Sequence, residues 1–93
     1  MLVVDCAYAP LRLQGETPVL PSHAWQLFSP NKALGLTGVR AAYAIAPAGA
    51  EDLLAALQAR APSWPLGAHG VALLAGWAHT ETQAWLADSL LTL

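Results

Sequence analysis

The sequence predicts an α/β fold in which three short strands are followed by helices. Two observations support this: short β-branched and aromatic runs separated by Gly and Pro in the first half, and helical periodicity in the second. We expect strands at about residues 2–5, 24–28 and 39–46, and helices at about 50–60, 68–78 and 81–92. With 93 residues, the chain is one domain at most.

The first strand is the run Leu2-Val3-Val4, which ends at Asp5. Because both of its faces are apolar, we expect a fully buried strand, parallel to its neighbour. Ligands bind at the carboxyl ends of strands in open α/β sheets, so Asp5 and the nearby Tyr8 are candidate site residues. The alternatives are a turn residue for Asp5 and a half-buried anchor for Tyr8.

The connections between the strands are rich in Pro and Gly. Residues 9–22 hold three prolines and a glycine, which predicts an irregular, lid-like loop. The second strand runs from Ala24 to Phe28, with Ser29 just past its end. A loop over residues 30–38 leads to the third strand, which Pro47 ends.

Helix signals follow from residue 50 onward. Glu51 and Asp52 fall in the first turn of the first helix, where acidic groups complement the helix dipole. The expected apolar faces are Leu53, Leu54 and Leu57 in the first helix, and Val71, Leu74 and Ala75 in the second, with Leu73 and Trp77 beside them. A capping box, Thr80 to Gln83, opens the third helix. The chain reaches Leu93 without a stop signal, so we expect it to be part of a longer protein.

The composition restricts the class of protein. The chain is 56% hydrophobic and 11% charged, against about 25% charged in an average soluble domain. A domain of this size buries only about 60% of its unfolded surface, so we expect further chain or a second copy to cover apolar faces.

The composition and the residue spacing argue against several classes of protein and of site. No apolar run of 18 residues is present, which argues against a membrane span. A net charge of −2 without a basic cluster argues against nucleic acid. A single cysteine rules out an internal disulfide and fits a reducing compartment, so we expect a cytoplasmic protein. No His or Cys lies at metal-ligand spacing from His23, so no metal site is expected.

Two cations in an apolar segment are the strongest functional signal. The chain has four Lys and Arg residues, and Lys32 and Arg40 lie within one stretch of residues 29–40. Burying either one unpaired would cost several kcal/mol. Lys32 is therefore either a solvated loop lysine or the partner of an anionic or electrophilic group, and Arg40 is either part of a surface ion pair or the partner of such a group.

Five polar residues at strand ends fit one cofactor, pyridoxal 5′-phosphate. A desolvated lysine such as Lys32 is a nucleophile, and arginine at Arg40 suits phosphate. An aspartate at position 5 keeps a pyridinium nitrogen protonated. A serine such as Ser29 can add a hydrogen bond to phosphate, and a tyrosine such as Tyr8 can donate one to the phenolic oxygen.

The spacing of these residues resembles the fold-type I, class I/II aminotransferases. The pattern is Asp5-x-x-Tyr8, then Ser29-x-x-Lys32-x-x-Gly35-Leu36-x-Gly38-x-Arg40-x-x-Tyr43. It is most similar to the branch of histidinol-phosphate aminotransferase and the threonine-phosphate decarboxylase of cobalamin synthesis. The matching motifs span residues 2–46, and Pro30-Asn31 before Lys32 departs from the family pattern.

The resemblance implies that residues 1–93 are the C-terminal portion of the large domain, without the small domain. Lys32 would carry the cofactor as a Schiff base, Asp5 would pair with its ring nitrogen, and Tyr8 with its phenolic oxygen. Ser29 and Arg40 would hold its phosphate. It also implies an amino-acid or amino-acid phosphate substrate, a homodimer, and a third strand antiparallel to its neighbours.

Three interpretations remain open. The chain is a fragment of an aminotransferase, or of the related decarboxylase, since both reactions use the same residues. Alternatively, it is a truncated, non-catalytic paralogue that acts as an interaction module. The third interpretation is an unrelated small α/β binding domain. In each case we expect the isolated chain to be inactive, because half of the site lies outside it.

Overall fold

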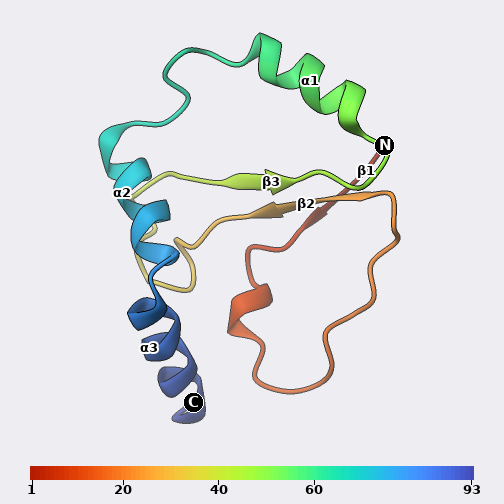
Figure 1. Ribbon diagram of the computed structural model, residues 1–93. Coiled ribbons are helices and arrows are strands. Elements are labelled where there is room, and N and C mark those ends of the chain that lie inside the picture. Colours follow the sequence, from red (N-terminus) through yellow and green to blue (C-terminus); the bar gives the residue numbers. More distant parts are fainter.

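A computed structural model describes residues 1–93 (Figure 1). Its elements in chain order are β1 (Leu2–Asp5), a short 3-10 helix η1 (Ala9–Leu11), β2 (Ala24–Phe28), β3 (Tyr43–Ile45), α1 (Glu51–Arg60), α2 (Ala68–Trp77) and α3 (Thr80–Leu91). The chain is a small α/β domain with a three-stranded mixed sheet and three helices, which confirms the expected fold class. None of the helices is both long enough and apolar enough to cross a membrane.

The sheet has the strand order β1-β2-β3. β1 and β2 are parallel, with Asp5 opposite Leu27, whereas β3 runs antiparallel to β2, with Tyr43 opposite Phe28. A parallel pair needs a crossover of a dozen residues or more, and residues 6–23 supply it without an α-helix. The expected direction of the third strand is confirmed.

The third strand is shorter than the expected range of 39–46. It pairs only at Tyr43–Ile45, because its partner β2 ends at Phe28 and is followed by Pro30, which has no N–H to continue the ladder. Residues before β3 form a turn instead, in which the Val39 N–H donates to the Leu36 carbonyl at 3.0 Å. The prediction was wrong for residues 39–42 and for residue 46.

The two faces of the sheet have different cover. Val4, Gln26 and Phe28 face the groove formed by the segment of residues 6–22, whereas Trp25 shares a hollow with Leu53 at the start of α1. Figure 1 shows this segment and α1 on opposite sides of the sheet, with α2 and α3 at the end where β1 and β2 finish. That end carries the candidate site residues.

The helices begin where the sequence predicts, but their apolar faces differ. α2 and α3 pack against each other and bury Leu73 and Leu86, whereas Val71 is 55% exposed. Leu53 and Leu57 of α1 are also exposed. The expected apolar faces of α1 and α2 are therefore only partly covered within this chain, where Leu54 and Leu74 are half-buried.

The hydrogen bonds at the start of α3 differ from the expectation, whereas those at the start of α1 agree with it. The expected capping box of α3 is absent, because the Gln83 side chain donates to the Trp77 carbonyl at 2.7 Å and His79 is the N-cap residue. In α1, bonds from its own backbone N–H and from the Gly49 N–H lower the pKa of Glu51 from its ordinary value. This carboxylate complements the start of α1, as expected.

The molecule is extended for its size. Its accessible surface is 6921 Å², whereas a folded monomer of this mass exposes about 5,100 Å². Its radius of gyration is 14.9 Å, against about 12 Å for a compact domain of this length. Only 8 of 93 residues are buried, and β1 is not among them, since Leu2 and Val3 are 38% and 45% exposed. The expectation of a fully buried first strand was wrong for this chain.

Candidate functional site

The sheet topology brings the polar candidates to one end of the sheet. Since β1 and β2 are parallel, Asp5 at the end of β1 and Ser29 just after β2 lie at the same end. Because β3 is antiparallel, residues that precede it, including Arg40, return to that end. Residues far apart in the sequence are thus gathered by pairing of the strands alone.

Asp5 adopts the turn geometry that the sequence left open as an alternative. Its Oδ1 accepts a hydrogen bond from the Ala7 N–H at 2.9 Å. The turn continues with the Ala9 N–H donating to the Cys6 carbonyl at 3.1 Å, which leads into η1. Asp5 is exposed and has a second oxygen that forms no bond within the chain, so the turn role leaves it able to bind a donor.

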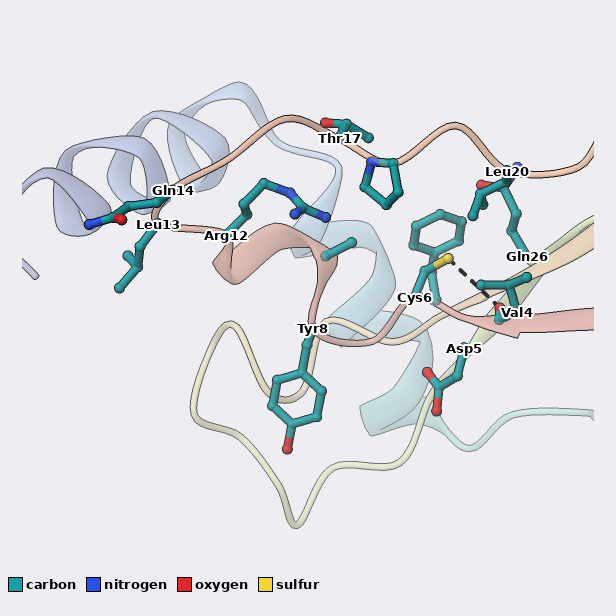
Figure 2. A pocket seen from close by; sticks show the side chains of 13 residues that line it. Val4, Asp5, Cys6, Tyr8, Arg12, Leu13, Gln14, Thr17, Leu20 and Gln26 are labelled. Carbon is teal, nitrogen blue, oxygen red and sulfur yellow. Dashed lines mark hydrogen bonds between the residues drawn. The ribbon is translucent and has the colours of Figure 1, made fainter.

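Tyr8 lies at the start of η1 and is 65% exposed. Its hydroxyl forms no hydrogen bond within the chain. In Figure 2 the side chains of Asp5 and Tyr8 point to the same side of the chain, away from Arg12. The two residues also line one hollow, the groove between β2 and the segment of residues 6–22.

Ser29 and Arg40 share a hollow of about 460 Å³ at this end of the sheet. Its other lining residues are Asn31, Ala41, Ala42, Pro65 and Leu66. Arg40 is exposed and has no carboxylate partner, so the surface ion pair considered as its alternative is absent. A free guanidinium in a hollow is a suitable ligand for phosphate.

The Ser29 hydroxyl is already engaged. Its Oγ donates to the Ala41 carbonyl at 2.7 Å, which ties the end of β2 to the segment before β3. A hydroxyl has a single hydrogen to donate, so Ser29 donates to an anion only if this bond breaks. The same bond brings Arg40, the neighbour of Ala41, next to Ser29.

Five lining residues of this hollow were not assigned from the sequence, and two of them, Asn31 and Leu66, are informative. Asn31 lines it, and its amide forms no hydrogen bond within the chain, so it offers two further donors. Its position beside Lys32, in the unusual pair Pro30-Asn31, was the available signal. Leu66 comes from the segment before α2, and the packing of α2 places it in the hollow.

Gly70 is a further residue that only the structure identifies. A Cβ at this position would lie 2.8 Å from the Arg40 carbonyl oxygen and 3.3 Å from the Ala41 Cβ. The absence of a side chain lets α2 approach the backbone beside Arg40. Gly70 therefore sets the position of Arg40 from the helix side.

Lys32 lies in a series of tight turns after β2. The Leu34 N–H donates to the Pro30 carbonyl at 3.0 Å and the Leu36 N–H to the Asn31 carbonyl at 2.9 Å. Gly35 has φ +67°, a conformation that glycine adopts without strain. Lys32 is exposed and lines neither the Ser29–Arg40 hollow nor the groove beside Asp5. The structure thus brings the candidates to one end of the sheet but not into one pocket.

The fold and this end of the sheet define a small α/β domain with an open, cationic hollow where its parallel strands finish. No protein-family model, curated protein or solved structure matches the chain.

Proposed function

We propose that this chain is part of the large domain of a fold-type I, pyridoxal-phosphate-dependent enzyme, an aminotransferase similar to histidinol-phosphate aminotransferase. The observation that carries the proposal is the ordered pattern Asp5-x-x-Tyr8 and Ser29-x-x-Lys32-x7-Arg40, whose members come to one end of the sheet. Cytoplasmic location, a homodimer and an amino-acid or amino-acid phosphate substrate belong to the same proposal.

The residues present fit the cofactor in charge and in donor chemistry. Arg40 and Asn31 offer unpaired donors to the phosphate in a shared hollow, and Ser29 joins them if its hydroxyl turns away from Ala41. Asp5 keeps a free carboxylate oxygen for the ring nitrogen, and Tyr8 keeps a free hydroxyl for the phenolic oxygen. When bound, the cofactor supplies an electron sink for a carbanion at the substrate α-carbon.

The role proposed for Lys32 is covalent attachment followed by proton transfer at the substrate α-carbon. It is the sole lysine of the chain and it forms no ion pair, so no other side-chain amine competes for the cofactor. Its exposed position requires the turn of residues 30–36 to be covered by other parts of the protein, because a lysine becomes nucleophilic when it is desolvated.

The related decarboxylase of cobalamin synthesis is an equal alternative on these residues, because both reactions start from the same attachment. A non-catalytic interaction module is the second candidate function. One observation favours it, the excess of exposed apolar surface. A protein partner would cover this surface as well as the rest of a large domain would.

The test is cofactor attachment at Lys32. We expect pyridoxal phosphate and borohydride to give an adduct on Lys32 that saturates as the cofactor concentration rises. Trypsin does not cut at a modified lysine, so the adduct joins residues 13–40 in one peptide. The amino group of Met1 is an internal reference, because it reacts without a binding site.

Two variants separate a specific site from simple amine reactivity. Lys32→Ala should abolish the adduct, and Arg40→Gln should raise the half-saturating cofactor concentration about tenfold, because a charge-assisted bond to phosphate is lost. An adduct that forms only in parallel with the Met1 reference, unaffected by Arg40→Gln, would contradict the enzyme proposal and leave the interaction module. The isolated chain should show no turnover in either case.

A further inference from the structure

We propose that the groove between β2 and the segment of residues 6–22 binds a small organic carboxylate, with Arg12 as the residue that binds its anionic group. This site goes beyond the proposed function, and it requires neither Lys32 nor the cofactor. We call it the Arg12 groove.

The Arg12 groove has the size and the lining of a small-molecule site. Its volume is about 520 Å³, and seven of its thirteen lining residues are hydrophobic. Ligand sites typically enclose about 300–1,000 Å³, with mainly apolar walls and a few convergent polar groups. The walls include Leu13, Pro18 and Phe28. The polar side chains of the lining are Arg12, Gln14, Thr17 and Gln26, together with Asp5 and Tyr8 at the end of β1.

Arg12 is held in place by its backbone rather than by a charged partner. Its N–H donates to the Ala9 carbonyl at 3.3 Å at the end of η1, and the segment is anchored to the sheet where the Cys6 N–H donates to the Leu27 carbonyl at 2.8 Å. The guanidinium forms no ion pair, although the chain has six acidic residues and only four basic ones. An unpaired cation on a fixed backbone is available to an anionic ligand.

Gln26 supplies the second polar group, and it comes from the sheet rather than from the segment of residues 6–22. It lies in the middle of the central strand, opposite Val4 on one side and Ile45 on the other. Its side chain is half-buried, and its amide forms no hydrogen bond within the chain. A polar side chain in an apolar strand is informative, because an apolar residue would serve the sheet better at this position.

Two residues of the proposed cofactor site, Asp5 and Tyr8, also line the Arg12 groove, but their side chains are directed away from Arg12. Figure 2 shows Arg12, Thr17 and Gln26 on one side of the β1 end, and Asp5 and Tyr8 directed to the other side. The Asp5 carboxylate is thus turned away from Arg12 and forms no ion pair with it, which leaves the guanidinium free for an anion. A ligand in the groove would place its carboxylate on Arg12, its hydrocarbon part against Phe28 and a polar group near Gln26.

A carboxylate with an apolar body fits better than a simple anion. The guanidinium fork matches a carboxylate with two parallel hydrogen bonds. The apolar walls stabilise a hydrocarbon part, which inorganic phosphate lacks. Affinity should therefore depend on both the charge and the apolar body.

The test is a titration of the full chain with 3-phenylpropionate, followed by NMR of the Gln26 side-chain amide and the Arg12 Nε. We expect saturable shifts of both signals. The uncharged 3-phenylpropanamide should bind about tenfold more weakly, and Arg12→Gln should weaken carboxylate binding by about the same factor. Arg12 is exposed, so this substitution leaves the fold intact.

Arg60→Gln is the matched control, because Arg60 is an exposed arginine in the last turn of α1, outside the groove. It should leave the affinity unchanged. The proposal is overturned by equal binding of the carboxylate and its amide, by equal loss in both arginine variants, by inorganic phosphate binding as tightly as the carboxylate, or by no saturable shift at millimolar ligand.

Discussion

Ser29 has one hydroxyl hydrogen, and the fold already uses it. The bond to the Ala41 carbonyl joins two segments that are twelve residues apart, beside the hollow that Arg40 shares. Ala41 is buried, so its carbonyl has little access to water as a replacement partner. At the scale of single residues, Ser29 is first a structural link and only then a candidate phosphate ligand.

We expect Ser29→Ala to lower the free energy of unfolding by about 1 kcal/mol, because the Ala41 carbonyl loses its partner. Urea unfolding followed by tryptophan fluorescence measures this. Ser89→Ala is the control, since the Ser89 hydroxyl bonds only to the Trp85 carbonyl one helical turn earlier, and its effect should stay within about 0.5 kcal/mol. Equal effects of the two substitutions would show that the Ser29 bond is not a structural link.

Asp5 and Arg40 illustrate how far single residues could be assigned from sequence. The order and spacing of polar residues at strand ends pointed to both. The sequence could not show that Asp5 also closes a turn onto Ala7, or that Arg40 lacks an acidic partner, because both facts depend on backbone geometry. Asn31 and Gly70 were missed for the same reason.

Among the elements, α2 has the most direct effect on the candidate site. It approaches the backbone of Arg40 and Ala41 through Gly70, where a Cβ would meet the Arg40 carbonyl oxygen at 2.8 Å. Backbone atoms do not move aside as a flexible side chain does, so a Cβ at Gly70 would push α2 and this segment apart. The position of a helix and the position of a site arginine are thus coupled.

We expect Gly70→Ala to destabilise the protein by about 1–3 kcal/mol, since overpacking outweighs the gain in helix propensity. Gly76→Ala in the same helix is the matched control, because a Cβ at Gly76 would meet nothing within 4 Å. That variant should be neutral or more stable by up to about 1 kcal/mol. Thermal unfolding by circular dichroism compares the two, and equal stability would exclude a tight contact between α2 and the segment at Arg40.

At the scale of the whole molecule, the chain exposes more surface than its mass requires. The excess over a compact monomer is about 1,800 Å², and one partner in an interface of standard size buries roughly 800 Å². Part of this surface lies on strands, where Val3 and Ile45 are 45% and 48% exposed. Both outer strands also have one unpaired edge, which favours pairing with another chain.

We therefore expect the isolated chain to self-associate as its concentration rises, and sedimentation velocity to detect this. Ile45→Lys should weaken the association at least about tenfold, a change of roughly 1.4 kcal/mol, because a charge on the exposed face of β3 disfavours contact. Val19→Lys, at a loop position that is 98% exposed, should have no such effect. A chain that stays monomeric at every concentration would contradict the expected homodimer.

The sequence by itself determined the α/β class, the starts of the three helices, the first two strands and the residues at strand ends. These follow from local periodicity, Pro and Gly positions, and acidic residues at a helix start, all of which act over a few neighbours. Only the tertiary structure decided the length of β3, the partner of Gln83, the two separate hollows and the closeness of Gly70 to Arg40. Each of these depends on contacts between segments that are distant in the chain, or on which hydrogen-bond partner a side chain takes. Residue spacing specifies neither.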